Sequence, residues 1–219
     1  MDQRFYPLTA VCFDLDQTLW RDTPEIVCAL RYELYEVITR STGMTFEEAR
    51  TAFEENFSGL GSTSKTLAKF GVPSPEEAVR DCLDRADVAQ YLQKDERLCA
   101  LLLNIKRSRQ DKPALYLITD SRRHTALRKL NALGITSAFD DMFCWDTHEA
   151  NKTNRAVFPY IQQRHAAAAS QLLMIGNSEI DDILPPYQQG WKTIHLAQEP
   201  SPKATAGIST IYDLERLLL

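Results

Sequence analysis

The chain has 219 residues, of which 44% are hydrophobic and 25% are charged, and its formal net charge is −5. This composition is typical of a globular protein and excludes a largely disordered or collagen-like chain. The acidic balance argues against a nucleic acid polymer as a partner, because phosphate-binding surfaces carry a basic excess. A small phosphorylated metabolite remains compatible. The composition gives no sign of a membrane span. Residues 1–8 include Asp2 and Arg4 and no long apolar run, so we expect neither a signal peptide nor a transit peptide, and a cytoplasmic protein.

Short apolar runs recur along the chain and have the length of buried strands: 10–15, 115–118, 142–145, 172–175 and 193–196. Helix-like stretches separate the later runs: 122–133, 154–169 and 179–189. This alternation predicts an α/β fold with a Rossmann-like parallel sheet covered by helices.

About ninety residues separate the first two runs, far more than a crossover of one helix needs. Their sequence has helical periodicity in five stretches: 24–42, 45–57, 63–70, 75–85 and 95–106. Thr45 and Glu48 have the spacing of a capping box. We therefore predict an inserted all-helical cap domain over 21–107, and a Rossmann-like catalytic core made of 1–20 and 108–219.

Polar side chains follow the apolar runs, at the sheet edge where ligands bind in open parallel sheets. In chain order they are Asp14 and Asp16, Thr119 and Asp120, Lys152, and Asn177 with Asp181 and Asp182. Asp14 and Asp16 are two positions apart and would project to the same side. Two carboxylates so close need a cation or a proton to balance them, and Mg²⁺ suits such an oxygen-rich site.

These four segments resemble, in order and approximate spacing, the four motifs of the haloacid dehalogenase superfamily. The resemblance implies a role for each of these side chains. Asp14 would be the nucleophile and Asp16 the general acid and then base, while Thr119 would hold a phosphate oxygen and Lys152 would offset charge. Mg²⁺ would be held by the Asp14 carboxylate, the Asp16 backbone carbonyl and the Asn177 side chain, with Asp181 and Asp182 orienting its water.

The resemblance also bears on the reaction and the substrate. Dehalogenases of the superfamily lack an aspartate at the position of Asp16, so its presence favours phosphoryl transfer. Segments 61–67 and 91–98 are loosely similar to the pyrimidine 5'-nucleotidase branch. Thr18, Asp120 and Lys65 are candidate substrate contacts, although a long cationic side chain such as that of Lys65 is more often simply solvated.

The chain departs from the superfamily pattern at two motifs. Asn177 stands where an aspartate is usual, so we expect weaker Mg²⁺ binding unless Asp181 or Asp182 compensates. No proline follows Lys152, which leaves the nearby Arg155 as an alternative cation.

We therefore expect a Mg²⁺-dependent phosphatase that hydrolyses a small phosphate monoester, such as a nucleotide or sugar phosphate, through an aspartyl-phosphate intermediate. One alternative is a low-turnover phospholigand-binding or regulatory protein, because Asn177 removes a charge beside the metal. Another is a phosphotransferase or mutase. Without a heptad run or a long apolar stripe, we expect a monomer or a homodimer.

Overall fold

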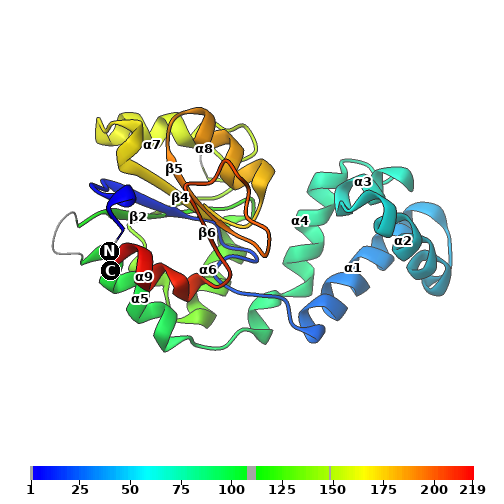
Figure 1. Ribbon diagram of the computed structural model, residues 1–219. Coiled ribbons are helices and arrows are strands. Elements are labelled where there is room, and N and C mark those ends of the chain that lie inside the picture. The colour runs from blue at the N-terminus through cyan, green and yellow to red at the C-terminus, as the bar shows by residue number, and fades with distance from the viewer. Residues whose placement is uncertain (1, 108–111, 148) are drawn as a thin grey trace. The chain divides into compact units, whose positions relative to one another are not determined.

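The computed structural model describes residues 2–107, 112–147 and 149–219 (Figure 1). The chain divides into two compact units. The first unit joins Met1–Arg21 to Leu92–Leu219 and contains the sheet, and the second unit, Asp22–Tyr91, is helical. In the described part of the chain, no helix is long and apolar enough to cross a membrane.

The strands of the first unit form a single parallel sheet, with six strands among the described residues in the order β3-β2-β1-β4-β5-β6. The strands are β1 (Ala10–Phe13), β2 (Ala114–Ile118), β3 (Asp141–Phe143), β4 (Leu172–Gly176), β5 (Lys192–Leu196) and β6 (Ala206–Ile208). Strand β1 lies between β2 and β4, with Cys12 opposite Tyr116 on one side and Met174 on the other. The predicted parallel α/β fold is confirmed, although β6 was not predicted.

Helices cover both faces of this sheet (Figure 1). Helices α7 (Val157–His165) and α8 (Leu184–Gln188) lie on one face, and α5 (Glu96–Lys106), α6 (Arg123–Leu133) and α9 (Leu214–Leu218) lie on the other. A π-helical turn, Glu179–Ile183, leads into α8. Short 3₁₀ turns span Gln3–Phe5, Val88–Tyr91, Thr136–Ala138, Ala169–Gln171 and Ile211–Asp213.

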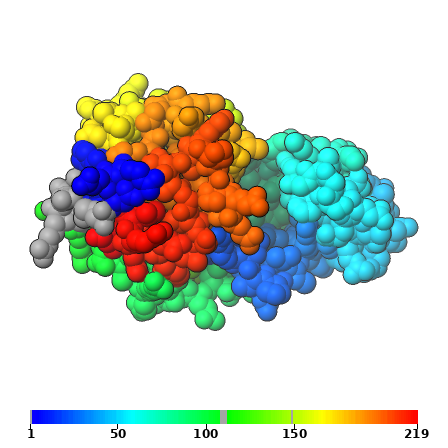
Figure 2. Space-filling model, viewed as in Figure 1, coloured from blue at the N-terminus to red at the C-terminus, as the bar shows by residue number. Residues whose placement is uncertain are grey.

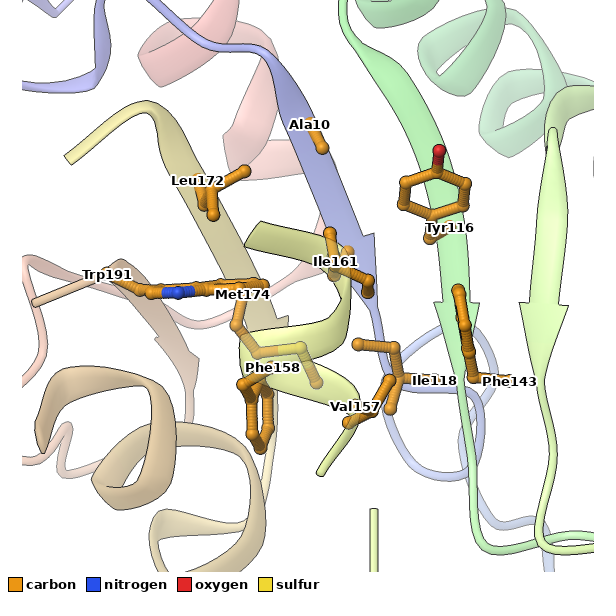
Figure 3. Packing of buried hydrophobic residues seen from close by; sticks show 11 residues of the cluster. Ala10, Tyr116, Ile118, Phe143, Val157, Phe158, Ile161, Leu172, Met174 and Trp191 are labelled. Atoms are coloured by element: carbon orange, nitrogen blue, oxygen red, sulfur yellow. The ribbon is translucent and has the colours of Figure 1, made fainter. Parts of the chain in front are cut away.

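The core under α7 shows why this helix packs where it does (Figure 3). Val157, Phe158 and Ile161 are fully buried at the i, i+1, i+4 spacing of one helix face, against apolar side chains of β1, β2 and β4. The ring of Phe158 meets that of Trp191 edge-on, with centroids 5.5 Å apart. Burial of this apolar surface anchors α7 and with it the loop that precedes it.

The second unit, Asp22–Tyr91, has a hydrophobic core of its own. Its helices are α1 (Pro24–Thr42), α2 (Phe46–Leu60), α3 (Thr63–Lys69) and α4 (Pro75–Ala86). Buried residues from all four form the core, among them Leu34 and Ile38 of α1, Phe53 of α2 and Cys82 of α4. The predicted capping box is present, because Thr45 N–H donates to Glu48 Oε2 at 2.8 Å and Glu48 N–H donates to Thr45 Oγ1 at 3.4 Å.

Helix α5 belongs to the first unit, whereas the predicted insertion of 21–107 included it. Its buried leucines and isoleucine face the first unit, where α5 contacts α9. Lys106 Nζ lies 2.7 Å from Asp140 Oδ1. The insertion therefore ends at Tyr91 and not at residue 107. Helical periodicity predicted α5 itself, but the period does not say which core an apolar face will join.

The N-terminal segment from Asp2 onward lies beside the C-terminal helix α9 (Figure 2). Asp2 N–H donates to the Leu217 carbonyl at 3.1 Å, the Tyr6 hydroxyl donates to the Leu218 carbonyl, and Arg4 donates to the Thr205 carbonyl at 2.8 Å. These bonds tie the N-terminal segment to α9 and to the turn before β6.

Candidate active site

Asp14 is the first residue after the central strand β1. Its N–H donates to the Ile175 carbonyl of β4 at 2.9 Å, which extends the strand pairing by one residue. Because β1 has a neighbour on each side, Asp14 is buried, with 4% of its surface exposed. The sheet therefore fixes Asp14 at the edge where α/β folds bind ligands.

Both carboxylate oxygens of Asp14 have partners. Lys152 Nζ donates to Oδ1 at 2.8 Å, and the Thr18 hydroxyl donates to Oδ2 at 3.0 Å. The same hydroxyl lies 3.3 Å from Asn177 Oδ1. Gln17, just before Thr18, has a left-handed φ of 62°, which turns the chain back toward Asp14. A single hydroxyl thus links Asp14 to the loop after β4.

Lys152 bridges two buried carboxylates. Its Nζ lies 2.7 Å from Asp182 Oδ1, and the Asp182 side chain is fully buried. The Ser178 N–H donates to Asp182 Oδ2 at 2.9 Å. Gly176 leaves the room that this carboxylate occupies, since a Cβ at position 176 would lie 2.3 Å from Asp182 Cγ.

Asp181, its neighbour, occupies a different environment. Asp181 is exposed, and its Oδ2 accepts a hydrogen bond from the Ser178 hydroxyl at 2.9 Å, while its N–H donates to Ser178 Oγ at 3.2 Å. These bonds cap the turn that begins at Ser178. Of the two acids that the sequence left as alternatives, the structure brings Asp182 beside Lys152 and keeps Asp181 at the surface.

Asp16 is held by a separate set of donors. Lys129 Nζ donates to Oδ1 at 2.6 Å, the Trp20 indole N–H donates to the same oxygen at 3.0 Å, and the Ser121 hydroxyl donates to Oδ2 at 2.8 Å. The Lys129 side chain is fully buried, whereas 29% of the Asp16 side chain is exposed. The two aspartates, two positions apart, are therefore oriented by different lysines.

The loop that carries Lys152 is fastened to the end of β2. The Thr153 hydroxyl donates to Asp120 Oδ1 at 2.9 Å. Arg155 is exposed and Lys152 is 8% exposed, so Lys152 and not Arg155 is the cation beside Asp14. Thr119 is buried, and its Oγ1 accepts a hydrogen bond from the Ser121 N–H at 3.1 Å.

The charges at this sheet edge do not balance, because it carries more carboxylates than lysines: Asp14, Asp16, Asp120 and Asp182 against Lys129 and Lys152. Burial raises the pKa of the Asp14 carboxyl, Lys152 acts against that rise, and repulsion from Asp182 and Asp16 adds to it. Burial alone would lower the pKa of Lys152, but Asp14 and Asp182 raise it well above its usual value. Burial would likewise raise the pKa of Asp16, yet Lys129 and the other donors outweigh it and lower that pKa.

A divalent cation fits this excess of negative charge. In the described part of the chain, no group of three or more His, Cys, Asp and Glu side chains is placed to hold a metal ion. Mg²⁺ does not need such a cage, because it binds through one or two carboxylates and keeps several waters. Asp14 Oδ2 and Asn177 Oδ1 share the Thr18 hydroxyl, so two suitable oxygens lie close together.

The sequence pattern of haloacid dehalogenase-like hydrolases matches residues 8–185, which is most of the chain and includes all four polar segments. The chain belongs to this family. It is therefore a haloacid dehalogenase-like hydrolase with a six-stranded parallel sheet among its described residues.

Known proteins resemble this haloacid dehalogenase-like hydrolase to different extents. Phosphate metabolism protein 8 of Saccharomyces cerevisiae is 28% identical over 136 residues, a match that covers 58% of this chain and only 40% of the yeast protein. A haloacid dehalogenase phosphatase from Thermococcus onnurineus has the same fold, with a TM-score of 0.67, 22% identity and coverage of 96% of this chain and 98% of that one. A haloacid dehalogenase-like hydrolase from Streptococcus pneumoniae has a TM-score of 0.68 and 19% identity, and the match covers 97% of this chain and 99% of that one.

The structure joins half of the ten predicted site residues of this haloacid dehalogenase-like hydrolase into one group and adds others. Asp14, Thr18, Lys152, Asn177 and Asp182 form one connected group. Lys65 lies exposed on α3 of the insertion, so its role as a substrate contact stays a prediction.

Sequence reasoning missed Lys129 and Ser121. Lys129 does carry a signal, because it stands on the buried face of α6 between Ala126 and Leu133, where an apolar residue is usual. A lysine at such a position needs a buried partner.

The close approach at Gly176 leads to a testable prediction. We expect Gly176→Ala to displace the Asp182 side chain and to lower the free energy of unfolding by about 1–3 kcal/mol, the usual cost of overpacking. Urea unfolding of both proteins measures this loss. Gly59→Ala is the control, because a Cβ there meets no atom within 4 Å and the change should not destabilise the protein. Equal stability of the Gly176 variant and the wild type would contradict the role of the glycine.

Proposed function

We propose that this haloacid dehalogenase-like hydrolase is a Mg²⁺-dependent phosphatase that hydrolyses a small phosphate monoester through an aspartyl phosphate on Asp14. The proposal rests on the different partners of the two aspartates. Asp14 is buried at the end of the central strand with Lys152 Nζ 2.8 Å from one oxygen, while Asp16 pairs with Lys129. A carboxylate beside a fixed cation is suited to attack a phosphate, and a second carboxylate is suited to move protons.

The proposed reaction has two halves. In the first half an Asp14 oxygen attacks phosphorus, the bond from phosphorus to the leaving oxygen breaks, and that oxygen takes a proton from Asp16. In the second half water attacks the aspartyl phosphate, Asp16 takes the water's proton, and phosphate leaves as Asp14 is regenerated. The ion pair with Lys129 favours the ionised form of Asp16, which the second transfer needs, while the first transfer uses the proton that Asp16 took up in the preceding cycle.

Other groups would hold the phosphate and the metal. Lys152 would offset the negative charge shared by Asp14 and the phosphate, and Thr119 would donate to a phosphate oxygen. Mg²⁺ bound by the Asp14 carboxylate, the Asp16 backbone carbonyl and Asn177 would supply further positive charge to the phosphate. Asp182, held by Lys152 and the Ser178 N–H, would orient water on the metal.

The neutral side chain of Asn177 leads to a prediction about Mg²⁺ affinity. We expect Asn177→Asp to tighten Mg²⁺ binding about tenfold or more, because a carboxylate replaces a neutral oxygen beside a divalent cation. Protection against thermal unfolding as Mg²⁺ is titrated measures this change without substrate. Asn151→Asp is the matched control, because Asn151 lies beside Lys152 in the chain but is no proposed ligand. Equal Mg²⁺ midpoints for Asn177→Asp and the wild type would shift the ligand role to Asp182.

The substrate is proposed at the level of chemical class. The acidic chain favours a small phosphorylated metabolite, such as a nucleotide or a sugar phosphate, over a nucleic acid polymer. In this proposal Thr18 and Asp120 contact the substrate from the sheet edge, and the insertion with Lys65 acts as a cap that selects the leaving group. The loose similarity of 61–67 and 91–98 to pyrimidine 5'-nucleotidases supports nucleoside monophosphates as one group of candidates.

The test is phosphate release from a panel of nucleotides, sugar phosphates and 4-nitrophenyl phosphate, with Mg²⁺ and with a chelator. We expect release that requires Mg²⁺ and that is highest for one group of metabolites. Silence of the whole panel would refute a phosphatase. A substrate with a labelled phosphate group separates hydrolysis from transfer. Label that appears in a second sugar phosphate, and not in free phosphate, would identify a phosphotransferase or mutase.

Asn177 favours a second candidate function, binding of a phosphorylated ligand without efficient turnover. A neutral amide in place of a carboxylate would weaken Mg²⁺ binding and so slow turnover. Lys152 and the hydroxyls would still be available to hold a phosphate. Calorimetry would then detect binding of a panel member that is not hydrolysed.

A further inference from the structure

Lys129 is a buried cation outside the set of residues that bind the proposed phosphate. It lies on α6, with no part of its side chain exposed, among the apolar residues Ala126, Leu130 and Leu133. An apolar residue of similar volume would fill this space without the cost of removing an ammonium group from water. The lysine therefore calls for an explanation other than packing.

The contacts of Lys129 converge on Asp16. Its Nζ donates to Asp16 Oδ1 at 2.6 Å, lies 3.3 Å from Ser121 Oγ, and stands 5.4 Å from the centre of the Trp20 ring. Ser121 and Trp20 themselves donate to Asp16. Three donors thus occupy both oxygens of one carboxylate and define its orientation.

This arrangement is separate from the one around Asp14. Lys152 pairs with Asp14 and Asp182, whereas Lys129 pairs with Asp16. Because 29% of the Asp16 side chain remains exposed, the carboxylate is held from the protein side and still reaches the open side of the sheet edge.

We propose that Lys129 is the positioning residue of Asp16, holding its carboxylate in the orientation from which it exchanges a proton with the leaving oxygen. The inference rests on the proposed phosphatase function and deepens it. Lys129 acts through Asp16 and does not contact the phosphate. Changing Lys129 therefore affects departure of the leaving group only to the extent that the substrate needs a proton from Asp16.

The test compares two substrates that differ in this need. Phenolate, with the conjugate-acid pKa of about 10 known for the tyrosine side chain, needs a proton to leave, whereas 4-nitrophenolate is a weaker base and leaves without one. We expect Lys129→Met to lower kcat/KM for phenyl phosphate about tenfold or more, and for 4-nitrophenyl phosphate less than about threefold. The value of kcat/KM reflects only the steps up to departure of the leaving group, so breakdown of the aspartyl phosphate does not affect it.

A double-mutant cycle shows whether Lys129 acts through Asp16. In an Asp16→Asn background, we expect Lys129→Met to change kcat/KM for phenyl phosphate less than about twofold. Lys106→Met is the matched control, because Lys106 pairs with Asp140 at 2.7 Å in the same unit without contacting Asp14 or Asp16. Lys106→Met should leave kcat/KM for both substrates unchanged.

Ser121→Ala gives a second measurement if Lys129→Met fails to fold, because it removes one hydrogen bond from Asp16 without leaving a buried charge. It should show a smaller loss with the same difference between substrates. Equal losses on both substrates, no loss, or a full loss in the Asp16→Asn background would overturn the role of Lys129. A wild type that hydrolyses neither substrate with Mg²⁺ would overturn the proposed phosphatase, and this inference with it.

Discussion

Asp14→Asn should abolish phosphate release while the protein stays folded. The substitution keeps the size of the side chain and its place after β1, but an amide does not form the aspartyl phosphate. We expect a loss of at least about a thousandfold in kcat, since removal of a catalytic nucleophile costs at least this much in other hydrolases. Phosphate release with Mg²⁺ on the best substrate of the panel measures it, and circular dichroism verifies the fold.

Asp181→Asn is the matched control for this variant. It is the same chemical change at an exposed aspartate whose side chain pairs with Ser178 and not with Lys152. We expect it to retain activity within about threefold, because surface changes have small effects. Activity in Asp14→Asn comparable to that of the control would refute Asp14 as the nucleophile.

Lys152→Met should be both inactive and unstable. Lys152 is the cation between the buried carboxylates of Asp14 and Asp182, at 2.8 and 2.7 Å. Removing one partner of a buried ion pair leaves charge without compensation and costs about 3–5 kcal/mol, so urea unfolding should show a loss of this size. Loss of one charged contact to the phosphate should lower kcat about a hundredfold or more.

Two further variants separate these effects. Lys106→Met breaks a lysine–aspartate pair of the same length, but its side chains are 29% and 39% exposed, so the loss of stability should stay below about 1 kcal/mol. Adding Asp182→Asn to Lys152→Met removes one uncompensated charge and should restore part of the stability without restoring activity. A Lys152 variant as stable as the Lys106 variant would show that Lys152 does not balance the buried pair.

Much of the sheet was predictable because its strands are buried on both faces and appear as short continuous apolar runs. β1, β2, β4 and β5 fall within one or two residues of the predicted runs. β6 was missed because Ala206–Ile208 is only three residues long and contains a glycine, so it has no such run. The helices of the insertion were predicted from their period, while the assignment of α5 to the insertion was wrong because the period does not identify the packing partner.

The candidate site was predictable where chemistry follows a strand directly. Asp14, Thr119 and Asn177 follow β1, β2 and β4, so the parallel topology alone brings them to one edge. Lys129 lies on α6, eight residues after Ser121, and reaches Asp16 only because α6 packs against the sheet with that face inward. Lys129 does not follow a strand, so its sequence position did not mark it as a site residue.

The sequence by itself determined the α/β fold, the presence of a helical insertion and the acids, hydroxyls and lysine that collect at one sheet edge, because strand length, helical period and strand-end position are local properties. Tertiary structure alone decided which lysine balances which carboxylate. It also separated the buried Asp182 from the exposed Asp181, and Lys152 from the exposed Arg155. Neighbours in sequence differ in burial because the direction of each side chain depends on the packing of the loop that carries it, and that packing joins residues far apart in the chain.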